Sequence, residues 1–324
     1  MAGKDQAAES SVRQMEGKGV SLAGAFSLGR GATLSMRPVQ WTKSLLVFLP
    51  LAFSVNERWS SDEMGLLGEL LLRALAGGLI FCALSGAVYI INDIFDRERD
   101  REHPRKCKRP IASGELPLAA AATTAAVLLA LSLTGSFLMG IGFGIVGIAF
   151  LAMNLSYSSF LKRVIILDTM VVSAGYLLRV LAGALIIDVT VSPWLYTTIG
   201  LGALFIALSK RHSELKAAGT NAPSQRAVLG QYSEEFLGQL VSITSASTLV
   251  AYALYTFSAR NVPPDHSLML TVPFVVFGLF RYLYLVNHTT DAESPELVII
   301  KDKPLIIDIV LWVATALIIL VLNR

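Results

Sequence analysis

The feature that most constrains this chain is an uncharged run of 46 residues, from Leu116 to Leu161. A membrane-spanning helix needs about 20 apolar residues, so this run is long enough for two such helices. Four glycines lie between residues 135 and 144, and glycine allows the chain to turn there. We therefore predict two consecutive membrane helices, Leu118–Met139 and Ile141–Phe160.

The rest of the chain contains further apolar windows of similar length. There are seven, namely Trp41–Val55, Leu66–Ile91, Val164–Ile187, Val189–Ser209, Phe236–Ala259, Leu268–Val286 and Leu305–Asn323. Charged residues make up only 16% of the chain and hydrophobic residues 54%, whereas soluble domains carry roughly 25% charged residues. We therefore predict an all-α integral membrane protein with nine transmembrane helices.

The same composition excludes several other classes of protein. Intrinsic disorder of the whole chain would require low hydrophobicity and high net charge. Two cysteines are too few for a disulfide scaffold or a zinc ribbon. A net charge of +3 is too small to indicate binding to nucleic acid, so we expect no nucleic-acid partner.

The basic residues are distributed unevenly between the predicted loops. If nine helices alternate in direction, the N-terminal segment and the loops after helices two, four, six and eight face one side, and they hold 21 of the 27 Lys and Arg residues. Because cytoplasmic segments are enriched in these residues, we expect a cytoplasmic N-terminus and an external C-terminus. Residues 1–35 lack the basic segment, apolar segment and cleavage site that follow one another in a signal peptide. We therefore predict that they form a disordered cytosolic tail. Residues 36–324 then form one transmembrane catalytic domain.

The densest group of charged residues lies where the second predicted helix leaves the membrane. Asn92, Asp93, Asp96 and Asp100 share an arc of about 100° on one face of a helix. Carboxylates at this spacing repel one another unless a cation lies between them. Because all four side chains offer oxygen ligands, they suit Mg²⁺, which is commonly shared with substrate phosphates.

A basic loop follows this acidic face and contains Arg105, Lys106, Lys108 and Arg109. Carboxylates beside cations are the arrangement expected for a metal-bound diphosphate, since the metal binds some phosphate oxygens and Lys or Arg binds the others. An ordinary cytoplasmic loop with solvated carboxylates near a helix end is the alternative interpretation.

A second group of polar residues begins after the fourth predicted helix. It includes Tyr157, Lys162, Asp168 and Arg179. Asp168 and Arg179 lie on one stripe of a helix, with Arg179 about 16 Å deeper in the membrane. An arginine at that depth faces a cavity or a partner and is a candidate functional residue, unless it forms an internal salt bridge.

The order of these motifs resembles the UbiA-type intramembrane prenyltransferase superfamily. Within it, the chain looks most like the decaprenyl-phosphate phosphoribosyltransferase (5-phosphoribosyl-1-diphosphate synthase) branch. The resemblance runs from about Met36 to the C-terminus. Asn92, Asp93, Asp96 and Asp100 match the first aspartate motif. The other matching elements include Arg37-Pro38, Gln40-Trp41, Lys43, Arg109-Pro110-Ile111-Ala112-Ser113-Gly114, Tyr157-Ser158, Leu161-Lys162, Leu167-Asp168, Gly175-Tyr176, Arg179, Lys210-Arg211, Glu214, Arg226, Tyr232-Ser233 and Asp302-Lys303-Pro304.

This resemblance implies a helix bundle around a central cavity, with an active site that opens to the cytoplasm of a bacterium. It implies Mg²⁺-dependent transfer of 5-phosphoribose from phosphoribosyl pyrophosphate to a polyprenyl phosphate, a step that supplies arabinan precursors for cell walls. Asp93, Asp96, Asp100 and Asp168 are the expected catalytic residues, and the first three hold Mg²⁺ together with Asn92. The expected substrate-binding residues are Lys43, Asn92, Arg105, Lys106, Arg109, Tyr157, Lys162, Arg179, Lys210, Arg211, Arg226 and Lys303.

Two departures and two competing functions qualify this interpretation. Ser44 stands where the branch has Asn, and Cys107 occupies a usually basic position. An aromatic prenyltransferase that uses a prenyl diphosphate would need the same aspartates but fewer cations. An ion-coupled transporter would place its carboxylates near the bilayer midplane in repeated halves, and the sequence shows no internal repeat. The sequence leaves a homo-oligomeric state open.

Overall fold

The computed structural model describes most of the chain, and its regular elements there are helices apart from one isolated bridge between Val55 and Trp59. The described residues are 22–55, 57–60, 64–103, 106–218, 227–259, 262–288, 299 and 301–322. The α-helices are α2 (Leu22–Ser35), α3 (Leu49–Phe53), α4 (Met64–Phe95), α5 (Arg97–Glu102), α6 (Pro110–Ser113), α7 (Leu118–Met139), α8 (Ile141–Ser159), α9 (Leu167–Ile187), α10 (Pro193–Ala218), α12 (Glu234–Ser258), α13 (Val272–His288) and α15 (Lys303–Leu322). The 3₁₀ helices are η1 (Pro38–Phe48), η2 (Lys106–Lys108), η3 (Leu161–Arg163), η5 (Ala227–Gln231) and η6 (Ser267–Thr271).

Seven helical segments in the described part of the chain are long and apolar enough to cross a membrane. They are α4, α7, α8, α9, α12, η6 with α13, and α15. The prediction of an all-α integral membrane protein is therefore confirmed, with seven candidate membrane-spanning segments in the described residues. The predicted windows Trp41–Val55 and Val189–Ser209 do not appear among the seven segments.

These two windows differ from the others for physical reasons. Trp41–Val55 folds as η1 followed by the five-residue α3, with a proline at position 50, so it contains no long α-helix. Pro193–Ala218 forms the long helix α10, but this helix is the least apolar of the long helices because its last third carries several charged residues. The nine-helix count thus remains a prediction.

The uncharged run that dominates the sequence forms two helices, as predicted. Helix α7 ends at Met139 and α8 begins at Ile141. Gly140 lies between them with a φ of 147°, which only glycine adopts without strain. Leu116–Leu161 therefore contains two helices that are each long and apolar enough to cross a membrane.

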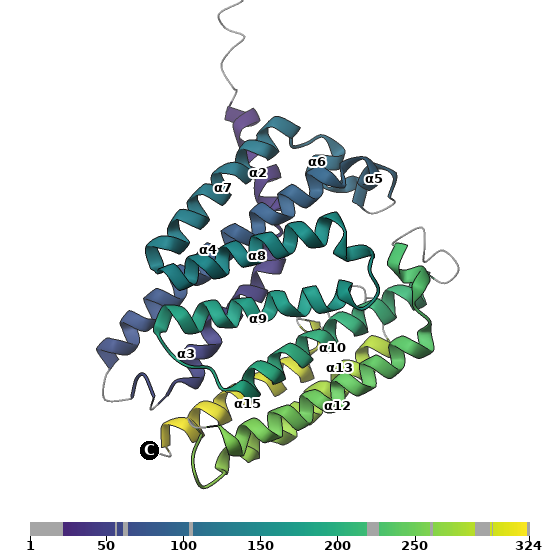
Figure 1. Cartoon of the computed structure of the whole chain (residues 1–324). Helices are drawn as coiled ribbons and strands as arrows, with labels where there is room; N and C mark the ends of the chain where they lie inside the picture. Colours follow the sequence, from purple (N-terminus) through teal and green to yellow (C-terminus); the bar gives the residue numbers. More distant parts are fainter. Residues whose placement is uncertain are drawn as a thin grey trace, which may run out of the picture.

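The long helices form two groups that meet along α9 and α10 (Figure 1). In the first group, α4, α8 and α9 pack around Phe81, whose ring contacts Phe143 and Phe150 at centroid distances of 5.6 and 5.4 Å. In the second group, Phe205 of α10 packs against Tyr282 of α13 at 5.5 Å. The Ser173 hydroxyl of α9 donates a hydrogen bond to the Gly200 carbonyl of α10 at 2.6 Å. This hydrogen bond is one of the contacts between the two groups.

Segment η1 packs between α4 and α9. Its backbone comes so close to α9 that a Cβ atom at Gly183 would lie 2.1 Å from the Val47 carbonyl oxygen. A glycine is therefore needed at this crossing. This close approach lies near the C-terminal end of η1.

The N-terminal part of the described chain is helical where we expected a disordered tail. Helix α2 ends at Ser35, which is buried. A Cβ atom at Gly31 would lie 3.4 Å from the Leu116 side chain, so α2 packs beside the segment that precedes α7. Ordered structure thus begins before the predicted boundary at Met36, and residues 1–21 lie outside the described residues.

Candidate active site

The acidic residues lie at the end of α4 and in α5, at the right-hand end of the bundle in Figure 1. The predicted helical face is largely preserved, because the Asp96 and Asp100 amides donate hydrogen bonds to the carbonyls of Asn92 and Asp96 at 2.9 and 2.8 Å. A break in helical geometry occurs at Asp96. The three aspartates therefore remain on one short segment but do not all face the same neighbours.

Asp93 and Asp100 share a single cation. Arg109 Nη1 donates to Asp93 Oδ1 at 3.1 Å and to Asp100 Oδ2 at 2.6 Å. Both carboxylates are buried. Arg37, at the start of η1, also binds Asp93 and lies over the Tyr89 ring at 4.9 Å. Arg37 has a left-handed backbone with a φ of 53°, and strained residues of this kind often occur at functional sites.

Asp96 and Asn92 bind the turn that follows α8. Lys162 Nζ of η3 lies 3.1 Å from Asp96 Oδ1 and 3.3 Å from Asp96 Oδ2. The Ser158 hydroxyl donates to Asn92 Oδ1. These contacts bring the first aspartate motif and the motif after the fourth predicted helix to one place, as the family resemblance implied.

The donor set at this place fits a small divalent cation. One nitrogen of Arg109 already occupies a position between the carboxylates of Asp93 and Asp100. No group of three His, Cys, Asp or Glu side chains converges as a metal site within the described residues. Mg²⁺ nevertheless commonly binds one or two carboxylates and completes its coordination with water and substrate phosphates. Two carboxylates beside a cavity therefore satisfy this requirement.

A cavity of about 220 Å³ extends from the aspartate segment toward the interior of the bundle. Asn92, Tyr157, Lys43 and Arg179 are four of the predicted site residues; they come from four elements and line this cavity together. Arg37, Ser85, Tyr89, Phe150 and Tyr176 also line it.

Arg179 is the deepest charged residue of the cavity. Its side chain is only 4% exposed. Its Nη1 donates to the Gly175 carbonyl at 2.8 Å and its Nη2 to the Ser85 hydroxyl at 2.9 Å. The guanidinium also lies over the Phe150 ring at 4.7 Å. All three partners are neutral, so these contacts do not form the internal salt bridge that was the alternative interpretation.

Asp168 lies outside the residues that line the cavity and is fully buried in a separate polar cluster. Arg211 Nε donates to Asp168 Oδ2 at 2.8 Å, and Arg211 also binds Glu214. The Tyr232 hydroxyl donates to Asp168 Oδ1 at 2.8 Å and accepts from the Ile166 amide at 2.7 Å. Burial, and then the negative charge of Asp168, raises the pKa of Tyr232 to about 12, so the hydroxyl remains a donor at neutral pH.

The remaining predicted site residues are distributed around the same end of the bundle. Lys106 lies in η2, Lys210 in α10 and Lys303 at the start of α15. None of the three is among the described residues that line the cavity. The predictions for Arg105 and Arg226 fall outside the described residues.

The sequence predictions missed Arg37, Ser158 and Tyr232 as site residues. The motif Arg37-Pro38 was a usable signal for the first, because it precedes a predicted helix at the membrane surface. Ser158 and Tyr232 belong to matching elements of the family resemblance, Tyr157-Ser158 and Tyr232-Ser233, but a single hydroxyl in a loop or helix end is common and neither was assigned a role. Their contacts arise from packing between distant segments.

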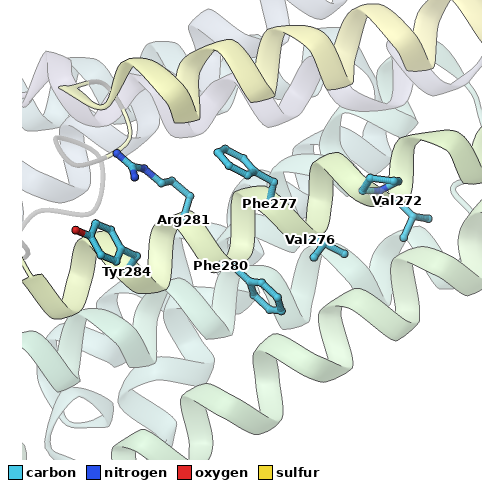
Figure 2. Close-up of a pocket in the computed structure, with 7 residues that line it drawn as sticks. Val272, Val276, Phe277, Phe280, Arg281 and Tyr284 are labelled. Carbon is cyan, nitrogen blue, oxygen red and sulfur yellow. The ribbon is translucent and has the colours of Figure 1, made fainter.

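A larger hollow of about 610 Å³ lies along α13 (Figure 2). It is a mainly apolar groove, and Phe277, Phe280 and Tyr284 are exposed along it. Arg281 at one end is paired with Asp302 at 2.8 Å. Exposed aromatic and aliphatic side chains on a membrane helix are the surface that lipid covers, and this groove shares no lining residue with the cavity of the aspartate segment.

Comparison with known proteins places these features in a family. Residues 45–298 match the UbiA prenyltransferase family. A decaprenyl-phosphate phosphoribosyltransferase of Mycobacterium tuberculosis is 30% identical over 289 residues, which cover 89% of this chain and 94% of that protein. A protein of the same name from Mycolicibacterium smegmatis is 30% identical over 298 residues, which cover 89% of this chain and 92% of the relative.

Solved structures show the same fold. A UbiA homolog from Archaeoglobus fulgidus, bound to GPP and Mg²⁺, aligns with a TM-score of 0.66 and 20% identity, covering 90% of this chain and 99% of the other. The apo structure of a UbiA homolog from Aeropyrum pernix K1 aligns with a TM-score of 0.53 and 17% identity, covering 88% and 98%. At these identities the likeness concerns the fold.

Proposed function

Because the chain belongs to the UbiA prenyltransferase family, we propose that it is a membrane-embedded transferase that moves 5-phosphoribose from phosphoribosyl pyrophosphate to a polyprenyl phosphate. The relatives named decaprenyl-phosphate phosphoribosyltransferase, which match about nine tenths of this chain, support this choice of substrates. The observation that carries the proposal is the meeting of Asp93, Asp96 and Asp100 with Arg37, Arg109 and Lys162 beside a cavity.

In the proposed reaction, the bond between ribose C1 and the diphosphate oxygen breaks, and its electron pair leaves with pyrophosphate. An oxygen of the acceptor phosphate forms the new bond to C1. The acceptor is already anionic at neutral pH and needs no general base. Arg109 and Lys162 bind the diphosphate and orient it, which lowers the barrier through positioning and charge neutralisation.

Asp93, Asp100, Asp96 and Asn92 are the residues that would hold Mg²⁺, and the proposal assigns the first three to catalysis. When bound, the metal supplies Lewis-acid stabilisation of the departing diphosphate. Arg109 then changes its partner from the two carboxylates to phosphate oxygens. The Mg²⁺ bound in the structural relative from Archaeoglobus fulgidus supports the use of a divalent metal in this fold.

The proposal includes an orientation. We infer nine membrane crossings, with η1–α3 and α10 as the two beyond the seven strongly apolar segments. The N-terminus and the aspartate segment then face the cytoplasm of a bacterium, and the C-terminus lies outside the cytoplasmic membrane. The excess of Lys and Arg on the inferred cytoplasmic side supports this orientation.

The decisive experiment follows label from ribose-labelled phosphoribosyl pyrophosphate into lipid. The purified chain in proteoliposomes, with Mg²⁺ and decaprenyl phosphate, should produce a labelled lipid and pyrophosphate in equal amounts. Omission of Mg²⁺ or of the lipid phosphate should abolish both products. Labelled lipid from a prenyl diphosphate and an aromatic acceptor, with none from phosphoribosyl pyrophosphate, would contradict the proposal in favour of an aromatic prenyltransferase.

A further inference from the structure

We propose that Arg179 and Lys43 form a subsite for a phosphate monoester, separate from the aspartate segment that holds the diphosphate. This inference rests on the proposed function and assigns a role to the deep part of the same cavity. Each proposed substrate carries a phosphate monoester, because phosphoribosyl pyrophosphate has its 5-phosphate and the lipid acceptor has its terminal phosphate. The subsite would bind one of these groups.

The first observation is the environment of Arg179. Its guanidinium is buried within a helix long and apolar enough to span a membrane, and it contacts a carbonyl oxygen, a hydroxyl and an aromatic ring. Its Nε has no hydrogen-bond partner among the described residues. A charged side chain in a membrane interior is unfavourable unless a partner or a cavity compensates for it. Arg179 lines a cavity, so an anionic ligand there would supply the missing compensation.

The second observation is the charge of the cavity as a whole. Arg37, Lys43 and Arg179 line it, whereas no aspartate or glutamate is among the described residues of its lining. Arg37 is already neutralised by Asp93, which lies just outside the lining. Lys43 Nζ lies over the Tyr176 ring at 5.7 Å and therefore points into the same aromatic-walled space as Arg179. The described lining is net positive and suited to an anion.

The third observation is the distance between this space and the aspartate segment. Ser85, which accepts a hydrogen bond from Arg179, precedes Asp93 by eight residues on α4. At 1.5 Å per residue, this places the contact about 12 Å deeper along the helix. One diphosphate bound at the aspartates would leave Arg179 without an anion. A ligand with anionic groups at two ends, or two anionic ligands, would use both places.

The chemistry of the two side chains fits a phosphate monoester. Arginine presents a planar fork of donors that matches two phosphate oxygens, and lysine adds a point charge. The Phe150 ring under the guanidinium restricts its orientation without neutralising it. An apolar prenyl chain in this space would instead contact a buried cation, so the subsite also favours a sugar-phosphate donor over a prenyl diphosphate.

The test uses the full-length protein in detergent or proteoliposomes and the variant Arg179→Gln. Ribose 5-phosphate carries only the monoester, and pyrophosphate carries only the diphosphate, so each probes one place as a competitive inhibitor. If the subsite binds the donor, the variant should raise the inhibition constant of ribose 5-phosphate and the KM for phosphoribosyl pyrophosphate about ten- to a hundredfold. The inhibition constant of pyrophosphate should not change. If the subsite binds the acceptor, only the KM for decaprenyl phosphate should rise.

Three further variants support the interpretation of this test. Arg179→Lys keeps a charge and should retain part of the affinity. If Arg179→Gln does not fold, Lys43→Gln takes its place in the test and should weaken binding of the same ligand. As a control, Arg73→Gln removes an exposed arginine of α4 that pairs with Glu69 on the same helix, and it should leave all constants unchanged. The proposal is overturned if folded Arg179→Gln leaves ribose 5-phosphate inhibition and both KM values unchanged, or if pyrophosphate inhibition weakens equally. Absence of any labelled lipid with the wild-type chain would instead contradict the proposed function, and direct binding of ribose 5-phosphate would still test the subsite.

Discussion

Arg109 joins the two ends of the aspartate segment through one nitrogen atom. It pairs with both Asp93 and Asp100, and both carboxylates are buried. Because two like charges at this separation would repel one another, the arginine stabilises a geometry that a metal-bound diphosphate can later use. The same residue therefore serves the folded state and the proposed reaction.

Removing one carboxylate charge from this group should abolish most of the transferase activity. We expect Asp93→Asn or Asp96→Asn to lower kcat about 10²- to 10³-fold, comparable with the loss of one electrostatic contact to a reacting group. Initial rates of lipid labelling at saturating Mg²⁺ and substrates measure this. The control is Asp265→Asn, which changes an exposed aspartate in the loop before η6. Equal activity of Asp93→Asn and the control would exclude Asp93 from catalysis.

Asp168 should behave differently from the other aspartates, because it pairs with Arg211 and Tyr232 rather than with Arg109 or Lys162. Tyr232→Phe leaves Asp168 Oδ1 without its tyrosine donor, and we expect it to reduce the free energy of unfolding by about 1–3 kcal/mol. We expect kcat to remain near the wild-type value. Thermal unfolding and initial rates measure the two effects, with Tyr284→Phe, an exposed tyrosine on α13, as control. A large fall in kcat without loss of stability would place Tyr232 in the reaction itself.

The raised pKa of Tyr232 gives this cluster a defined pH dependence. Burial and Asp168 raise the pKa to about 12 from an ordinary value of 10.0, so the folded state holds the hydroxyl proton more tightly than the unfolded state. The resulting stabilisation is complete below pH 10 and is lost as the pH rises toward 12. The wild-type melting temperature should therefore fall across this interval by more than that of Tyr232→Phe. Parallel pH curves for the two proteins would contradict this assignment.

At the scale of the elements, hydrophobic patterning predicted helix positions well: α7 has the predicted bounds Leu118–Met139, whereas α4 extends beyond its apolar window. The window Leu66–Ile91 corresponds to α4, which continues to Phe95 because backbone hydrogen bonds persist after the apolar pattern stops at Asn92. Helical periodicity also predicted that Asp93 and Asp100 share a face, and their common partner Arg109 is consistent with this. The local sequence pattern was sufficient to predict where the helices lie and that Asp93 and Asp100 share a face.

Contacts between distant elements could not be predicted from periodicity. Arg37 reaches Asp93 across 56 residues, and Lys162 reaches Asp96 across 66. Which cation pairs with which carboxylate depends on how η1, α4 and α8 pack, and local pattern contains no information on that packing. The family resemblance brought these motifs together in advance but did not predict that Asp168 pairs with Arg211 and Tyr232.

The crossing of η1 and α9 depends on one glycine. A Cβ atom at position 183 would overlap the Val47 carbonyl, so Gly183→Ala should push η1 away from α9 and reduce stability by about 1–3 kcal/mol. Gly238→Ala in α12 is the matched control, because no atom lies within 4 Å of its added Cβ and alanine favours a helix. Melting temperatures of both variants measure the difference. Equal stability of Gly183→Ala and wild type would show that η1 can move without cost.

At the scale of the whole molecule, the proposed reaction depends on which side of the membrane the aspartate segment faces. Phosphoribosyl pyrophosphate is a multiply charged, water-soluble donor that is made in the cytoplasm. The side chain of Gln231 donates to the Arg163 carbonyl at 3.4 Å, next to Lys162 and its partner Asp96, so Gln231 marks the same end of the bundle as the aspartates. Thr190 follows α9, whose first turn lies at that end, and so marks the opposite end. These two residues therefore report the orientation of the site.

Nine crossings and seven crossings give different positions for Gln231 and Thr190. If α10 spans the membrane, the two residues lie on opposite sides; if it does not, they lie on the same side. Both side chains are exposed. In a chain with Cys82 and Cys107 replaced by serine, we expect a membrane-impermeant maleimide to label Gln231→Cys only from the cytoplasmic side and Thr190→Cys only from the external side. Labelling of both from one side would contradict nine crossings, and the reverse pattern would place the aspartate segment outside, where the proposed donor is not available.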